Sequence, residues 1–394
     1  LYVGSAVASS EIPCKGAARA LLMRGYLQRA GYSLSSTTGK LTRPDDTTRK
    51  SYFEAVIREW ETFKVEGYHN FYGGGYEQLF KNYSQLILNN QESLWEIAFE
   101  PNQGQTDNSG MWATYNGPIV DAPGSYSGTS SYMGRANAFF TVLPYWKSFY
   151  ESNADGSQKD VRRDVNFVDY AYVWNATTET QDKSYTASSI AKSLYRYPGK
   201  WRREWMALGF VDPNHTGVNY CPLRYADVVL MAAEAYNETN NTTEAWKLLN
   251  DVRQRAEATP ITSANYASLM KAPKVYNLDF IDDSDDAGKF RTALYWERGF
   301  ELCYEGQRKY DFLRWGCLGD ALRAAQAYIE SWYPDANEYI NASTLQSWDP
   351  VSWASSNYVA GHNFVDGKHE LYPIPLAEIQ SNAALNGQNN PGFE

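Results

Sequence analysis

The sequence predicts a mainly α fold, in which a tetratricopeptide-like α/α superhelical scaffold of paired helices carries long irregular loops. Apolar residues recur at helical spacing in several segments, and one pair of these segments is separated by only a short polar turn. Between the helical segments lie long stretches rich in Gly, Ser, Asn and aromatic residues. Such loops are usually functional, because packing alone would favour shorter connections.

The predicted helices follow one another in chain order as residues 15–30, 47–64, 224–238, 245–256, 294–316 and 318–333. In the first, apolar residues lie at near-helical spacing and Gly31 follows as a stop signal. In the second, Val56, Trp60 and Phe63 fall on one stripe. These patterns indicate helices that bury one face.

The segments 224–238 and 245–256 form the predicted helix pair. The first is rich in alanine, which allows close packing between helices. Asn241 is the expected N-cap of the second, with Glu244 three residues later. Two such helices resemble a tetratricopeptide-type hairpin, although no strict 34-residue period is present.

The segment 294–316 mixes charges and aromatic rings around a whole helix, so several charges are expected against apolar surface. Buried charges persist only when they are paired. The spacing predicts the pairs Arg298 with Glu301, Glu305 with Arg308, and Asp311 with Arg314. The predicted structural ion network is Glu297, Arg298, Glu301, Glu305, Arg308, Asp311 and Arg314.

The same glutamates allow a catalytic interpretation, because Glu297, Glu301 and Glu305 could supply the carboxylate pair of a glycoside hydrolase. The neighbouring arginines would hold these carboxylates ionised, whereas a general acid needs a raised pKa. No GxSxG, HExxH, P-loop or GxGxxG motif is present. The sequence therefore favours a protein that is not an enzyme, with no catalytic residues and no cofactor.

Composition and spacing disfavour several other kinds of function. The net charge of −10 disfavours nucleic acid, which needs a concentrated basic face. The four cysteines form no CxxC pair, so no zinc site is expected. The acidic run 282–286 could bind calcium, but a solvated loop is the favoured interpretation, because the EF-hand spacing is absent. No apolar run is long enough to cross a bilayer.

Four motifs resemble the SusD/RagB family of nutrient-binding outer-membrane lipoproteins of Bacteroidota. They are CPLRYADVVLMAAEAYNE (221–238), EAWKLLNDVRQRA (244–256), ERGFELCYEGQRKYDFLRWG (297–316) and LYPIPLAEIQSNAALNGQNNPGFE (371–394). The last has Ala383 where the family often has proline. The resemblance covers nearly the whole chain and identifies one SusD-like domain over 1–394, with the scaffold at about 15–100 and 221–333 and loop-rich ligand-side regions at about 101–220 and 334–370.

The resemblance implies a binding protein that captures oligosaccharides at the cell surface and passes them to a SusC-like TonB-dependent transporter. It also implies a place on the extracellular face of the outer membrane, through a lipid anchor. Because the chain begins at Leu1 without a signal peptide, we expect a fragment that lacks the lipidated N-terminal part. Peptides or another nutrient as the ligand, and a pure interaction scaffold, stay open as alternatives.

Sugar rings stack on Trp and Tyr, and their hydroxyls need amide or carboxylate partners. The loop 101–135 carries the best local mixture, with further candidates in 174–175 and 348–358. The predicted ligand-binding residues are Trp112, Tyr115, Asn116, Asp121, Tyr126, Tyr132, Trp174, Trp353 and Tyr358, with Asn175 and Trp348 as secondary candidates.

Overall fold

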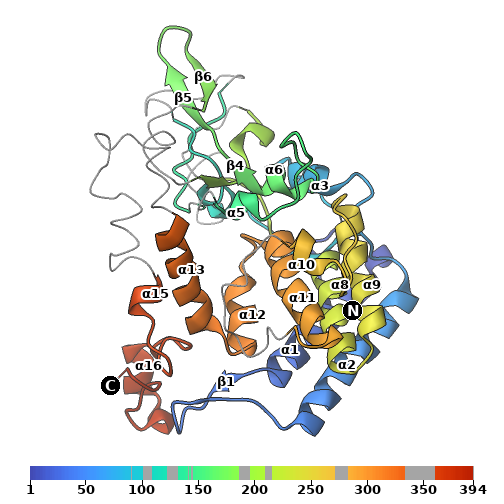
Figure 1. Cartoon of the computed structure of the whole chain (residues 1–394). Coiled ribbons are helices and arrows are strands. Elements are labelled where there is room, and N and C mark those ends of the chain that lie inside the picture. Colours follow the sequence, from blue (N-terminus) through green and yellow to red (C-terminus); the bar gives the residue numbers. More distant parts are fainter. Residues whose placement is uncertain are drawn as a thin grey trace.

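The computed structural model describes residues 1–89, 91–100, 109–121, 132–140, 142, 145–185, 196–208, 215–270, 283–332 and 360–393. Long helices make up one part of the molecule, and the short strands between residues 167 and 184 lie above them as drawn in Figure 1. The prediction of a mainly α, tetratricopeptide-like scaffold with irregular loops is confirmed.

The helices are α1 (Lys15–Ala30), α2 (Asp46–Glu66), α3 (Tyr76–Ser84), α4 (Trp112–Tyr115), α5 (Tyr145–Ser148), α6 (Arg162–Asn166), α8 (Tyr225–Glu238), α9 (Thr242–Arg255), α10 (Tyr266–Leu269), α11 (Asp286–Leu302), α12 (Arg308–Arg314), α13 (Leu318–Trp332), α15 (Ala360–Asn363) and α16 (Leu376–Ser381). Short 3-10 turns are η1 (Gly4–Ala6), η2 (Arg203–Trp205) and η5 (Ala383–Leu385).

The strands are β1 (Ser33–Leu34), β2 (Leu41–Thr42), β3 (Ser93–Ile97), β4 (Phe167–Val168), β5 (Ala171–Asn175), β6 (Thr180–Ser184), β7 (Tyr197–Pro198) and β8 (Tyr220–Arg224). In the described residues they form only two-stranded antiparallel pairs: β1 with β2, β3 with β8, β4 with β7, and β5 with β6. The sheets are therefore local ties between segments.

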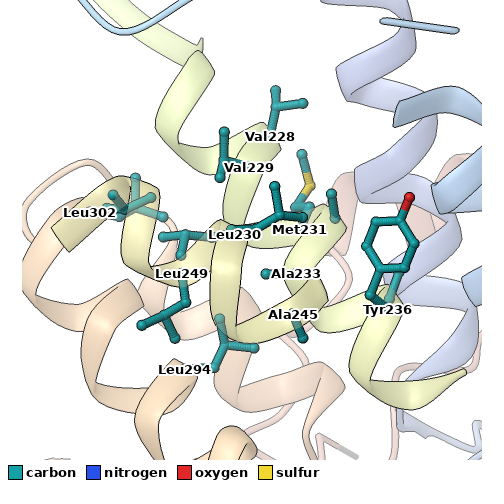
Figure 2. Close-up of a cluster of buried hydrophobic side chains, with 14 of the residues drawn as sticks. Val228, Val229, Leu230, Met231, Ala233, Tyr236, Ala245, Leu249, Leu294 and Leu302 are labelled. Carbon is teal, nitrogen blue, oxygen red and sulfur yellow. The ribbon is translucent and has the colours of Figure 1, made fainter. Parts of the chain in front are cut away.

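Helix α8 is the centre of the scaffold. It packs against α9, α2 and α11, while α1 packs against α2. Figure 2 shows apolar side chains of α8, among them Leu230 and Met231, clustered with Leu249 of α9 and Leu294 of α11. The alanines of α8 let these neighbours approach closely, and Asn241 caps α9 by accepting a hydrogen bond from the Glu244 backbone N–H.

The segment 294–316 is not one continuous helix, so that part of the prediction is wrong. Helix α11 ends at Leu302 and α12 begins at Arg308. Tyr304 and Gly306 between them have positive φ angles of 67° and 81°. Side chains from other segments donate to the carbonyl oxygen of Glu301 near the helix end. Arg224 Nη2 lies 2.6 Å from this oxygen and Lys200 Nζ lies 2.9 Å from it. These donors replace the next intrahelical partners.

A buried ion network surrounds the C-terminal half of α11. Glu297, Glu301 and Arg162 are each fully buried. Arg162 Nη1 lies 2.5 Å from Glu297 Oε1 and 3.1 Å from Glu301 Oε2. Arg224 Nη1 lies 2.6 Å from Glu301 Oε1, and Arg255 pairs with the same oxygen. Glu301 is therefore compensated by three arginines.

Other charges complete this network. Arg253 joins Glu297 at 2.9 Å to Glu151 at 2.7 Å. Glu305, in the turn after α11, lies 2.6 Å from Arg224 and 2.5 Å from Lys200. The members are the carboxylates Glu92, Glu151, Asp160, Glu297, Glu301 and Glu305 and the cations Arg162, Lys200, Arg224, Arg253 and Arg255.

A second buried network lies where α8, α11 and α12 meet. Arg298 is 2.9 Å from Asp227 and 2.8 Å from Asp311, and Arg314 is 2.8 Å from Asp311. Arg314 also pairs with Glu234. The pair of Asp311 with Arg314 forms as expected, but Arg298 does not pair with Glu301, because the three arginines named above already surround that carboxylate.

Arg308 also departs from the expected pairing. Its guanidinium lies 4.2 Å from the Tyr295 ring centre and 4.4 Å from that of Phe312, and donates to Tyr295 O at 2.6 Å. The expected pair with Glu305 does not form, because Arg224 and Lys200 hold that carboxylate. Arg308 has no carboxylate partner among the described residues.

The network keeps its acids ionised. Burial alone would raise the pKa of the Glu301 carboxyl, but the positive charges of Arg255, Arg224 and Arg162 lower it well below its ordinary value. In the second network, burial again opposes ionisation, and Arg298 and Arg24 lower the pKa of Asp227 from 3.8 to about 2. The side chains of Glu301 and Asp227 are therefore both ionised in the folded protein.

We expect Glu301→Gln to lower the free energy of unfolding by about 3 to 5 kcal/mol, because it strands buried guanidinium groups. Glu77→Gln is the matched control: Glu77 is 52% exposed and pairs with Lys81 at 3.1 Å, so its loss should be under about 1 kcal/mol. Urea denaturation of both variants measures the difference. Equal losses would contradict a stabilising network.

The low pKa of Asp227 makes the free energy of unfolding depend on pH in the acid range. The folded state binds this proton more weakly than the unfolded chain, so the stabilisation is present above the ordinary value of 3.8 and lost as pH falls toward about 2. Between neutral pH and about pH 2, the free energy of unfolding of Asp227→Asn should therefore decrease by about 2 kcal/mol less than that of the parent protein. Unfolding free energies at a series of pH values test this, and parallel curves for the two proteins would contradict it.

For Arg308→Met we expect a loss of about 1 to 2 kcal/mol, because cation–π contacts and one hydrogen bond disappear while no carboxylate is stranded. Arg224→Met removes one of the three arginines that compensate Glu301 and leaves Glu305 with Lys200, so it should cost more, about 3 to 5 kcal/mol. Denaturation of the two variants side by side gives the comparison. A loss for Arg308→Met as large as that for Arg224→Met would show that Arg308 compensates a buried acid after all.

Candidate ligand-binding surface

The loop layer above the scaffold is built from short extended segments that lie side by side (Figure 1). Val120 forms bridges with Ala136 on one side and Tyr172 of β5 on the other. The Gln181 amide of β6 fastens these segments, because its nitrogen donates to Gly134 O at 2.7 Å and its oxygen accepts from a backbone N–H at 2.8 Å. The β5–β6 hairpin therefore supports the loop residues next to it.

One face of the β5–β6 hairpin is aromatic. Strand register places Tyr172 opposite Lys183 and Trp174 opposite Gln181, so these four side chains share a face. Beyond the strand ends, the rings of Tyr170 and Tyr185 lie 5.7 Å apart. Tyr185 is 60% exposed. Tyr170 and Tyr172 are buried, so the hairpin presents only Tyr185 and the half-buried Trp174 to solvent on this face.

Glu204 lies against this aromatic face. The hydroxyls of Tyr170 and Tyr172 both donate to its carboxylate, and Lys183 Nζ lies 3.4 Å from it. Burial alone would raise the pKa of Glu204, but these two hydrogen bonds and the charge of Lys183 lower it. Lys183 also lies 3.9 Å from the centre of the Tyr170 ring. The carboxylate of Glu204 and the ammonium group of Lys183 are thus held beside the tyrosine rings.

A second aromatic group lies where α4 meets the segment 136–140. The ring of Tyr115 meets that of Phe139 edge to face, with centres 4.3 Å apart. The Phe140 backbone N–H donates to Tyr115 O at 3.2 Å. Phe139 and Phe140 are 64% and 54% exposed. Exposed neighbouring rings of this kind are typical of surfaces that bind a ligand.

Three of the predicted ligand-binding residues are mainly packed inside the loop layer. Trp112 lies 5.5 Å from Trp201 and 4.7 Å from Tyr220, measured between ring centres. Asn116 is buried and donates from its amide to Trp112 O at 3.0 Å, which closes the short helix α4. Tyr132 is only 2% exposed.

The remaining described candidates lie nearer the surface. Tyr115 and Trp174 are half-buried, and Asp121 is exposed while its backbone N–H donates to Tyr172 O at 3.0 Å. Asn175 shapes the hairpin turn, because its side chain accepts from the Thr177 backbone N–H at 3.0 Å. The candidates Tyr126, Trp348, Trp353 and Tyr358 lie outside the described residues.

The structure therefore does not bring the predicted residues into one cluster. It separates Tyr115, with its partner Phe139, from the hairpin group that contains Trp174. Phe139, Phe140 and Tyr185 are exposed rings that the sequence analysis did not single out. Two adjacent phenylalanines inside an irregular stretch were a usable signal, since a loop seldom needs two large apolar residues in succession.

In the described part of the acidic run, the aspartates at 283, 285 and 286 accept hydrogen bonds at or near the start of α11. Asp285 accepts from the Gly288 backbone N–H at 2.7 Å and caps α11. Asp286 accepts from the Trp246 indole at 3.2 Å, and Asp283 accepts from the Tyr266 hydroxyl. Across the described residues, no three His, Cys, Asp or Glu side chains gather as a metal-ligand group.

Among the helices that the structure describes, none is both long and apolar enough to cross a membrane.

The model of the SusD family matches residues 91–393, which is more than half of the chain. Two curated relatives come from Formosa agariphila. SusD-like protein P25 is 31% identical over 172 residues, covering 44% of this chain and 24% of the relative. SusD-like protein P2 is 28% identical over 311 residues, covering 77% of this chain and 48% of the relative. The chain thus spans about a quarter to a half of the length of these relatives.

Solved structures share the fold. A SusD homolog from Bacteroides thetaiotaomicron superposes with a TM-score of 0.68 at 24% identity, covering 100% of this chain and 67% of that one. Surface glycan-binding protein A from Bacteroides fluxus gives 0.57 at 17% identity, covering 99% and 65%. The four motifs, the helical scaffold and the family match agree, and the chain belongs to the SusD family.

Proposed function

We propose that this protein binds oligosaccharides at the cell surface, without cleaving them, and delivers them to a SusC-like TonB-dependent transporter of the outer membrane. The proposal includes a lipid anchor on the extracellular face. Membership of the SusD family supports it, as does the name of the Bacteroides fluxus neighbour, a surface glycan-binding protein.

The observation that carries the proposal is the exposed aromatic edge of the loop layer. Phe139 and Phe140, beside Tyr115, are 64% and 54% exposed, and Tyr185, in the separate hairpin group, is 60% exposed. Rings of this kind can stack on the C–H faces of sugars. Lys183 lies on the hairpin and the backbone of Asp121 is bonded to Tyr172 of the same hairpin, so both can contact hydroxyl groups there. We propose Tyr115, Asp121 and Trp174 as further ligand contacts on this side.

The glycoside hydrolase alternative is disfavoured by the state of its carboxylates. Glu297 and Glu301 are fully buried, and Glu305 is 5% exposed, so a glycosidic bond cannot reach them. The lowered pKa of Glu301 also opposes the proton donation that a general acid must provide. Release of shortened sugars from a polysaccharide would nevertheless overturn the binding proposal.

Peptides or another nutrient stay as the second candidate, because exposed rings and a lysine can also bind a peptide. The two ligand classes separate in one calorimetric experiment, in which the protein is titrated with a panel of oligosaccharides and with a mixture of short peptides. Binding to peptides alone would replace the glycan proposal.

We expect Tyr115→Ala and Phe139→Ala each to weaken oligosaccharide binding about threefold to tenfold, because each removes one stacking ring. Their melting temperatures should stay close to that of the parent protein. Affinity electrophoresis and calorimetry measure the binding.

Tyr372→Ala is the matched control, since Tyr372 is 71% exposed and lies near the C-terminus. It should bind as the parent does. Trp112→Ala, by contrast, should lower the melting temperature, because its indole packs against Trp201 and Tyr220. Unchanged binding in both Tyr115→Ala and Phe139→Ala would reject this surface.

A further inference from the structure

A cavity of about 450 Å³ lies in the helical scaffold, far from the β5–β6 hairpin. Its walls come from α1, α2, α8, α11 and the segment after α12. In Figure 1 α1, β1 and α2 lie at the lower end of the molecule and the hairpin at the upper end. The cavity is therefore separate from the proposed glycan surface. Its volume is within the range of small-molecule sites.

The cavity wall carries more positive than negative charge. Its charged lining residues are Arg43, Arg49, Arg291, Arg314, Glu234, Glu238 and Asp320, which sum to +1, and Asp46 beside Arg43 and Arg49 brings the local sum to zero. Two arginines are already satisfied. Arg314 holds Glu234, with Nη2 at 2.8 Å, and Arg291 holds Glu238, with Nε at 2.5 Å.

Arg43 and Arg49 have guanidinium donors to spare. The terminal nitrogens of Arg49 lie 3.5 Å from Asp46 and 3.8 Å from Glu238, beyond good hydrogen-bond distance. The Arg43 guanidinium is 5.4 Å from the Tyr32 ring centre and 3.9 Å from Asp46. Asp46 itself is 88% exposed, so water weakens its hold on both. Within the described residues, neither arginine has a closer carboxylate.

Two glycines make this cavity rigid. A Cβ atom at Gly31 would lie 2.4 Å from Arg314 O, and one at Gly316 would lie 2.6 Å from the Tyr32 ring. The Tyr32 backbone N–H donates to Arg314 O at 2.7 Å. The end of α1 is thereby held against the end of α12, which fixes the wall that carries Tyr32 and Arg43. A preformed wall lowers the ordering cost of binding.

We propose that this cavity binds a small organic monocarboxylate, whose carboxylate lies between Arg43 and Arg49. The planar guanidinium groups match a carboxylate in shape and charge. The apolar part of the ligand would lie over Leu27, Phe53 and Leu294, which line the same cavity.

The test is calorimetric titration of the intact chain with the sodium salts of acetate, benzoate and glucuronate. Glucose, sodium chloride and sodium sulfate serve as reference titrants. We expect at least one carboxylate to bind, and glucose not to bind. Arg43→Gln and Arg49→Gln should each weaken that binding about tenfold, through loss of a charge-assisted contact.

Arg58→Gln is the matched control, because Arg58 lies on the same helix as Arg49, is exposed, and removes the same charge. Arg43→Gln is the variant safest for folding, since the Arg43 side chain is 41% exposed. Melting temperatures would show whether the variants fold. Oligosaccharide binding should be unchanged in Arg43→Gln, which keeps this proposal separate from the glycan one.

Three results would overturn the proposal. The first is that no carboxylate binds better than glucose up to about 20 mM, a range that includes weak sites. The second is that carboxylate binding survives in the folded Arg43→Gln/Arg49→Gln double variant. The third is that sulfate binds as tightly as the best carboxylate, which would indicate a general anion site.

Discussion

The need to compensate one buried carboxylate connects most of this structure. Glu301 lies at the end of α11 with no exposed surface, and three arginines from three other segments pair with it. Separating any of these segments would strand a charge in the protein interior, which costs several kcal/mol. The family motifs follow from this constraint, because Arg224 belongs to the first motif, Arg255 to the second and Glu301 to the third.

The same network joins the loop layer to the scaffold. Arg162 opens α6 and Lys200 follows β7, both among the loops, yet their charged ends reach Glu297, Glu301 and Glu305 of the helical part. Donors at the helix end also compensate the negative end of the α11 dipole. The exposed rings of the loop layer are therefore presented from a base that is fixed by buried charge.

Patterns among neighbouring residues predicted the helices well, but they could not predict contacts between residues far apart in the sequence. Periodic apolar residues and Gly31 placed α1 correctly, because both act within a few residues. Arg162 and Glu297 are 135 residues apart, so spacing within one helix could not reveal that pair. The ligand side was harder still. Trp112 and Phe139 are both aromatic residues outside the long helices, and only tertiary contacts pack the first against Trp201 and Tyr220 and leave the second exposed.

The most direct test of this account is a double-mutant cycle between Arg224 and Glu301, whose charged atoms lie 2.6 Å apart. The free energies of unfolding are measured for Arg224→Met, Glu301→Gln and the double variant. The account predicts a coupling energy of about 2 kcal/mol or more, because each single change removes a directly bonded opposite charge from a buried side chain. Losses that add to within about 0.5 kcal/mol would contradict it, since independent sites behave in that way.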